Sequence, residues 1–103
     1  MIKLVKNKTL ELNAICNKHH VALFYLFGST TNDTFNDRSD LDFAVIFNED
    51  LSPIDKGDAF FGLLDDLELL FKRKIDLISY KVIKNPIFKA EVDRTKIKLY
   101  AVV

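Results

Sequence analysis

Two aspartates stand directly before an apolar run, in the stretch Ser39-Asp40-Leu41-Asp42. Alternate residues of a strand point to the same face, so the carboxylates of Asp40 and Asp42 would lie side by side, about 6–7 Å apart along the backbone. Like charges this close repel, and each is costly to remove from water, so the pair predicts a cation between them. Mg²⁺ binds a few carboxylate oxygens together with waters and substrate phosphates. The spacing therefore indicates a magnesium site.

A third carboxylate, Asp76, lies in the middle of another apolar run, between Ile75 and Leu77. An acid is unexpected at that place in a strand. If this strand lies beside the one that follows Asp40, Asp76 joins the other two acids on one face of the sheet. Three such carboxylates form a two-metal site of the kind used in nucleotidyl transfer.

Gly28 and Ser29 end the aromatic run His20-Val-Ala-Leu-Phe-Tyr-Leu-Phe27. A glycine allows the backbone to approach a ligand closely, and a helix beginning at Ser29 would offer its amides to phosphate. This pair supplies the phosphate-binding half of the expected site.

The order Gly28-Ser29, nine further residues, and then Ser39-Asp40-Leu41-Asp42, with Asp76 on a later strand, resembles the minimal nucleotidyltransferase domains of the polymerase β-like superfamily. The resemblance covers essentially the whole chain and extends to "NPIF" (residues 85–88) and to the closing "KIKLY" (residues 96–100). It implies a site made of three metal-binding catalytic acids and three nucleotide-binding residues: Asp40, Asp42 and Asp76; and Gly28, Ser29 and the turn residue Ser39.

The resemblance also implies an activity and its partners. In that family the acceptor hydroxyl attacks the α-phosphorus, one metal lowers the pKa of the hydroxyl, and the other stabilises the charge that develops as pyrophosphate leaves. We expect transfer of AMP from ATP, or of another nucleoside monophosphate, with Mg²⁺ as cofactor. Asp76 would help to activate the acceptor. The acceptor would come from a partner or from self-association, and small members of the family act as antitoxins of HEPN-type toxins, by modifying or by binding them.

One departure keeps a second interpretation open. Where many members follow Gly-Ser with a small residue, arginine and glycine, this chain has Thr31, Asn32 and Asp33. Loss of a cation should weaken nucleotide binding unless Arg38 or the basic C-terminal part compensates. The alternative is a binding-only antitoxin or regulator without turnover. An antibiotic-type enzyme is less favoured, because the second domain that encloses small substrates is missing.

The elements expected to position these residues alternate between helix and strand. Hydrophobic periodicity predicts a helix over residues 2–18, a long helix after the Ser52-Pro53 cap, and a short helix over residues 85–94. Residues 20–27, 41–47, 74–80 and 96–103 are predicted as strands, and residues 29–39 as a turn or short helix with a loop. The pattern favours an α/β fold, a mixed sheet of about four strands with helices packed against it, and leaves the strand order open.

Composition limits the other classes. With 103 residues and 49% hydrophobic content, we expect one domain over residues 1–103 with one core. No apolar run is long enough to span a membrane, no signal peptide is evident, and a single cysteine, Cys16, cannot form an internal disulfide, so we expect a cytoplasmic protein.

Charge and the remaining polar residues are given structural interpretations. Residues 1–71 carry a net charge of −6 and residues 72–103 carry +6, which we attribute to ordinary surface pairing rather than to nucleic-acid binding. His19 and His20 are expected at a helix end rather than on a metal. Residues 72–74, Lys-Arg-Lys, are expected to favour a helix C-terminus, with contact to substrate phosphates as the alternative. Tyrosines 25, 80 and 100 are expected in strands of the core.

Overall fold

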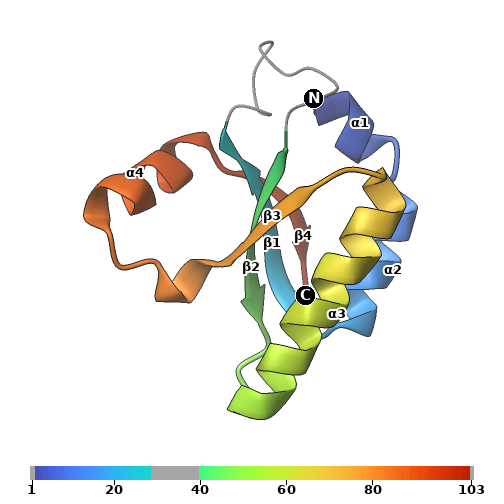
Figure 1. The fold of residues 1–103 in the computed structure, drawn as a ribbon, viewed down its shortest axis with the longest axis horizontal. Coiled ribbons are helices and arrows are strands. Elements are labelled where there is room, and N and C mark those ends of the chain that lie inside the picture. Colours follow the sequence, from blue (N-terminus) through green and yellow to red (C-terminus); the bar gives the residue numbers. More distant parts are fainter. Residues whose placement is uncertain (1, 29–39, 103) are drawn as a thin grey trace.

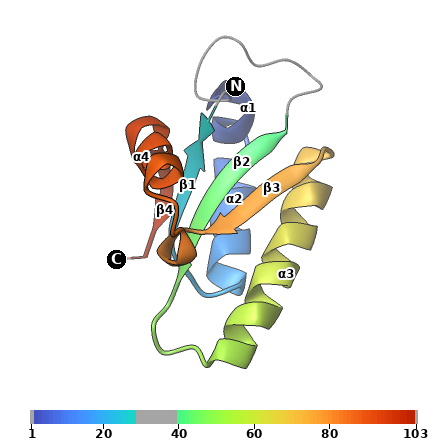
Figure 2. The ribbon, with the colours of Figure 1, turned by 60° about the vertical axis from the view of Figure 1, so that its left-hand side comes forward.

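The computed structural model describes residues 2–28 and 40–102, and it places helices on both faces of one sheet (Figures 1 and 2). The fold is the mixed α/β arrangement that the sequence predicts. In chain order, the elements are α1 (Ile2–Lys6), α2 (Thr9–Lys18), β1 (Val21–Phe27), β2 (Leu41–Phe47), α3 (Pro53–Phe71), β3 (Ile75–Ser79), the 3₁₀ turn η2 (Tyr80–Val82), α4 (Pro86–Thr95) and β4 (Ile97–Ala101).

The sheet has the strand order β3-β2-β1-β4. β1 runs antiparallel to β2 and to β4, whereas β2 and β3 are parallel. A parallel pair needs a long crossover connection, and α3 supplies it. As a result, the end of β1 and the starts of β2 and β3 meet at one edge of the sheet, the upper edge in Figure 1.

The face of the sheet covered by α2 and α3 carries the main core. Phe24 and Phe43 are fully buried there and stack with their ring centroids 4.8 Å apart. The apolar stripe predicted for α3 packs against them, with Leu63 and Leu67 fully buried. The prediction that this stripe is core is confirmed.

The opposite face is covered by α4 (Figure 2), and it buries fewer side chains than the first. Among the described residues, the buried cluster on this face consists of three side chains, Phe27, Ala44 and Val92, with partly buried Tyr25, Ile78, Tyr80 and Ile83 packed against it. Val92 is the one buried residue of α4. Polar contacts supplement this cluster: the Tyr80 hydroxyl donates to Asp93 Oδ1 at 2.6 Å.

Both predicted helix caps are present. The Ser52 hydroxyl oxygen accepts a hydrogen bond of 3.1 Å from the Asp55 amide, with Pro53 in the first turn. Asn85 Oδ1 accepts from the amides of Ile87 and Phe88 at 2.9 and 3.2 Å. These side chains satisfy amides that a helix leaves unpaired at its start, and so they fix where α3 and α4 begin.

The single helix predicted over residues 2–18 is wrong, because a turn at residues 7–8 divides it into α1 and α2. The Thr9 hydroxyl donates to the Lys6 carbonyl at 2.6 Å, and the Lys8 amide donates to the Val5 carbonyl at 3.1 Å. Local bonds of this kind compete with the regular helical pattern.

Two predicted strands are shorter than expected. β3 ends at Ser79, and Tyr80 starts η2, where its carbonyl accepts from the Ile83 amide at 3.3 Å. Tyr80 is therefore not a strand residue, although its ring still faces that of Tyr25 with centroids 6.2 Å apart. β4 covers Ile97–Ala101 of the predicted residues 96–103. The turn or short helix predicted within residues 29–39 lies outside the described residues.

Cys16 is buried in the main core, and burial raises the pKa of its thiol to about 12. It therefore behaves as a small apolar side chain. In the described ranges 2–28 and 40–102, every helix is too short or too polar to cross a membrane.

Candidate functional site

The candidate site lies at the edge of the sheet where β1 ends and β2 and β3 begin. In the parallel ladder of β2 and β3, Asp42 is the direct partner of Asp76. The condition set by the sequence, that the strand carrying Asp76 lies beside the strand carrying Asp42, is therefore met. Asp42 is half-buried and Asp76 is exposed to solvent.

Gly28 forms the wall against which the Asp42 carboxylate lies. The backbone of Gly28 has φ +82°, and a Cβ added there would be 2.7 Å from Asp42 Oδ2. Both facts require glycine, since a side chain is strained at this φ and would also displace the carboxylate. Phe27, the residue before it, is the register partner of Asp42 in β2.

The electrostatics of Asp42 reflect this crowding. Its pKa is raised from 3.8 to about 6, first by burial and then by the negative charges of Asp76 and Asp40 and a hydrogen bond with Asp76. The carboxylate is therefore mostly ionised at neutral pH but held in a place that disfavours its charge. A cation at this edge would relieve that cost.

Asp40 is close enough to act on Asp42, but its own carboxylate faces Lys74. Asp40 Oδ2 and Lys74 Nζ are 3.8 Å apart, and the Leu41 amide donates to the Lys74 carbonyl at 3.4 Å. Among the residues that the structure describes, no three acid, histidine or cysteine side chains form a group able to hold a metal ion. The structure thus joins Asp42 with Asp76 and leaves Asp40 at their margin, paired with a lysine.

The Lys72-Arg73-Lys74 stretch has two places in the structure. Lys72 is the C-cap of α3, with φ 54° and its amide donating to the Glu68 carbonyl at 2.9 Å, in agreement with the helix-end interpretation. Lys74 lies beside Asp40, at the candidate site. For this stretch, contact with substrate phosphates is only the alternative interpretation of the sequence. Only the pairing of β3 with β2 brings this lysine to the acids.

Thr95, at the end of α4, contacts Gly28 of the candidate site, and sequence reasoning missed this contact. The Gly28 amide donates to Thr95 Oγ1 at 3.0 Å, and the Thr95 hydroxyl donates to the Glu91 carbonyl at 2.9 Å. Gly28 and Thr95 are 67 positions apart in the chain, and neither spacing nor residue type pointed to the contact.

Some predicted site residues remain predictions. Ser29 and Ser39, assigned to nucleotide binding, and the loop residues Thr31, Asn32, Asp33 and Arg38 lie outside the described residues.

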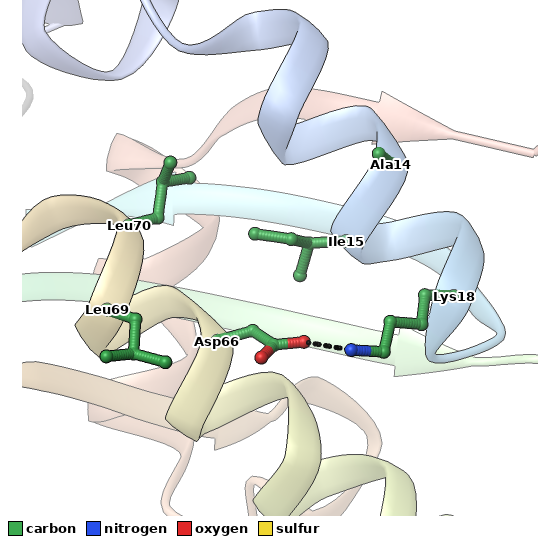
Figure 3. Close-up of a pocket in the computed structure, with 6 residues that line it drawn as sticks. All are labelled: Ala14, Ile15, Lys18, Asp66, Leu69 and Leu70. Atoms are coloured by element: carbon green, nitrogen blue, oxygen red, sulfur yellow. Dashed lines mark hydrogen bonds and ion pairs between the residues drawn. The ribbon is translucent and has the colours of Figure 1, made fainter.

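The histidine pair and a surface hollow lie away from this edge. His19 is the C-cap of α2, as expected for a helix-end residue, and its Nε2 is 2.6 Å from Asp66 Oδ2. Next to this contact, a hollow of about 380 Å³ opens between α2 and α3, with the Lys18–Asp66 ion pair at one side (Figure 3). It is lined by Ala14, Ile15, Lys18, Asp66, Leu69 and Leu70, none of which is a predicted site residue.

A mixed sheet that aligns acids of two parallel strands beside a strand-ending glycine is the arrangement expected from the resemblance to α/β nucleotidyltransferases. Residues 11–102 match the family model described as polymerase beta nucleotidyltransferase, and the chain belongs to this nucleotidyltransferase family.

Individual relatives agree with this assignment. The Methanocaldococcus jannaschii protein named "Putative protein adenylyltransferase MJ1379" is 32% identical over 77 residues, which cover 75% of this chain and 75% of that protein. A structure described as a toxin-antitoxin with AMP-PNP superposes with a TM-score of 0.70 at 22% identity, over 91% of this chain and 73% of the other. A tri-AMPylated Shewanella oneidensis HEPN toxin in complex with MNT antitoxin gives a TM-score of 0.63 at 23% identity, over 99% and 74% of the two chains. At these identities, the two structures establish the shared fold.

Proposed function

We propose that residues 1–103 form one Mg²⁺-dependent nucleotidyltransferase domain that moves a nucleoside monophosphate, AMP from ATP, to a hydroxyl group of a protein partner. The partner is a HEPN-type toxin, for which this protein acts as the antitoxin in the cytoplasm. The family membership supports the type of reaction. The name of the M. jannaschii relative and the AMPylated toxin in the Shewanella complex support the nucleotide and the acceptor.

The observation that carries the proposal is the register of Asp42 with Asp76 beside Gly28. Two carboxylates from separate strands share one edge of the sheet, and the glycine fixes the position of the first. A purely structural edge would not place two acids opposite each other, because like charges in direct register destabilise a sheet.

The donor set fits Mg²⁺. Aspartate oxygens are hard ligands of the kind that this ion prefers, and the crowded charges around Asp42 favour a cation. Asp42 and Asp76 would hold the ion. Asp40 would join them by exchanging its ion pair with Lys74 for a bond to the metal. When bound, the metal supplies charge neutralisation on the phosphates and lowers the pKa of the acceptor hydroxyl.

The remaining steps of the proposed reaction are assigned to residues of this chain. Asp76 is exposed at this edge. In this proposal it receives the proton of the acceptor hydroxyl as the hydroxyl oxygen bonds to the α-phosphorus. The bond from the α-phosphorus to the bridging oxygen breaks, and pyrophosphate leaves with the electron pair. Ser29 and Ser39 complete the nucleotide pocket in this proposal.

A binding-only antitoxin is the second candidate. Two features favour it. The pairing of Asp40 with Lys74 competes with metal binding, and Asn32, where many members have arginine, removes a cation that would bind the nucleotide. In that case the protein would neutralise its toxin by contact alone.

The proposal is tested with purified protein, Mg²⁺ and ATP labelled at the α-phosphate, alone and with the purified HEPN-type protein of the same host. Parallel reactions use ATP labelled at the γ-phosphate, which separates nucleotidyl transfer from phosphorylation. The variants are Asp40→Ala/Asp42→Ala and Asp76→Asn. The matched control is Asp58→Asn, an exposed acid of α3 away from this edge.

We expect α-label, but not γ-label, on the partner with the wild type and with Asp58→Asn, and a loss of at least about 100-fold with the site variants. No transfer under Mg²⁺ or Mn²⁺ would overturn the enzymatic proposal. If Asp40→Ala/Asp42→Ala still neutralised the toxin in cells, binding alone would account for the function.

A further inference from the structure

We propose that Thr95 is a positioning residue of the candidate site, which holds Gly28 and, through it, the carboxylate of Asp42. The inference rests on the proposed function, because it assigns Thr95 a part in binding the metal and nucleotide at that edge. Thr95 lies 67 positions after Gly28 in the chain and on another element, α4.

The geometry forms a short chain of contacts. The Glu91 carbonyl accepts from the Thr95 hydroxyl at 2.9 Å, which orients the oxygen of that hydroxyl to accept from the Gly28 amide at 3.0 Å. Gly28 in turn has φ +82°, and Asp42 Oδ2 lies so close to it that an added Cβ would be only 2.7 Å away. Each contact sets the direction of the next, from the last turn of α4 to the carboxylate.

The Thr95 contact also decides what the Gly28 amide does. An amide that donates to Thr95 is directed toward α4. This hydrogen bond holds the end of β1 in place. Gly28 then contributes to the site because it has no side chain and leaves room for the Asp42 carboxylate. Glycine adopts φ +82° without strain, and the hydrogen bond to Thr95 is one of the contacts that hold the backbone in this conformation.

The link is significant because α4 is otherwise lightly attached. Its one buried residue is Val92, and its other anchors include the ring contact of Phe88 with Phe27, with centroids 6.0 Å apart, and the Tyr80–Asp93 hydrogen bond. A displacement of α4 would be transmitted to Gly28 through Thr95. The position of this helix therefore sets the geometry at Asp42.

The test compares Thr95→Val, which keeps the shape but removes the hydroxyl, with Thr95→Ser, which keeps it. Thr9→Val is the matched control, since the Thr9 hydroxyl also donates to a carbonyl, that of Lys6, in a different part of the fold. Hydrogen exchange of the Gly28 amide and the amide resonance of Asp42 are measured by NMR. Mn²⁺ binding in the presence of AMP-PNP is measured by electron paramagnetic resonance.

We expect a protected Gly28 amide in the wild type. Thr95→Val should speed its exchange, shift the Asp42 resonance and weaken Mn²⁺ binding by about 10-fold or more, as for other residues that orient metal ligands. Thr95→Ser should restore all three, and Thr9→Val should change none of them. If Thr95 had only a structural role, Thr95→Val would lower the melting temperature without weakening Mn²⁺ binding.

Several outcomes would overturn the inference. An unprotected Gly28 amide in the wild type would mean that the contact does not form in solution, and this measurement stands even if Thr95→Val fails to fold. Unchanged Mn²⁺ binding and an unmoved Asp42 resonance in Thr95→Val would show that Thr95 positions nothing. If the wild type bound neither Mn²⁺ nor AMP-PNP, the proposed function would fail, and the shift of the Asp42 resonance alone, reversed by Thr95→Ser, would decide for or against the positioning.

Discussion

The two faces of the sheet are built differently. The face under α2 and α3 buries large side chains such as Phe24, Phe43 and Leu63, and it is closed to solvent. The face under α4 has a smaller buried cluster, Phe27, Ala44 and Val92, with only partly buried apolar side chains packed around it and polar contacts such as Tyr80–Asp93 beside it. At the end of this second face stand the acids.

This difference separates stability from chemistry. Apolar burial stabilises the fold in proportion to the area removed from water, so the α2–α3 face supplies most of it. The α4 face instead holds an aspartate whose pKa is raised by burial and neighbouring acids, an arrangement that costs stability at neutral pH and is typical of functional sites. The following predictions test this contrast.

The largest effect on folding is expected from Leu63→Ala in the main core. Loss of this fully buried side chain should lower the free energy of unfolding by about 2–5 kcal/mol, because the removed atoms leave a cavity. Val92→Ala, on the α4 face, should cost roughly 1.5 kcal/mol for two methyl groups. Urea unfolding of both variants measures the difference, and equal losses would contradict the division between the faces.

The substitution Gly28→Ala should combine a moderate loss of stability with loss of the site. Its backbone at φ +82° would cost a side chain about 1–2 kcal/mol, and the new Cβ would meet Asp42 Oδ2 at 2.7 Å. We expect transfer of α-label to fall by at least about 10-fold. The control is Gly57→Ala, where a Cβ meets no atom within 4 Å and the helix gains about 0.5–1 kcal/mol. Full activity of Gly28→Ala would show that Gly28 is not needed for the site.

The free energy of unfolding should depend on pH because the pKa of Asp42 is raised in the folded protein. Its pKa in the folded protein is about 6, above the ordinary 3.8, so the folded state binds the proton more tightly than the unfolded state. Its contribution to stability is complete below about pH 4 and is lost as the pH rises through 6. The loss is on the order of 1–2 kcal/mol for a carboxylate in partial contact with water.

Asp42→Asn isolates this contribution, because asparagine resembles the protonated acid. The variant should become more stable than the wild type as the pH rises from about 4 to about 7, while its nucleotidyl transfer is lost. Chemical unfolding at several pH values measures the gap. A gap that stays constant with pH would contradict the raised pKa of Asp42.

The smallest effect is expected from Asp66→Asn between α2 and α3. This change weakens the contacts of Asp66 with His19 and with Lys18, at 2.6 and 3.1 Å, and should cost about 0.5–1 kcal/mol because the groups are partly exposed. Added salt should reduce the difference, since it screens the ion pair. Label transfer should be unchanged, and a loss of activity would connect this face to the site.

Much of the fold could be predicted because its signals are local. The caps at Ser52 and Asn85, the apolar stripe of α3 and the buried run of β1 all follow from neighbouring residues, and the structure confirms them. The errors are local as well. At the break at residues 7–8, the Thr9 hydroxyl donates to the Lys6 carbonyl and the Lys8 amide to the Val5 carbonyl, and hydrophobic periodicity does not detect such contacts.

The sequence by itself determined the chemistry that the site offers: two aspartates at strand spacing, a third within a later strand, and a glycine at the end of the first strand. Residue type and short spacing are properties of a few consecutive residues. The tertiary structure alone decided that β3 lies parallel to β2, and hence that Asp76 faces Asp42, Lys74 faces Asp40 and Thr95 holds Gly28. These contacts join distant parts of the chain, and they arise from the packing of the sheet against α3 and α4, which no local pattern encodes.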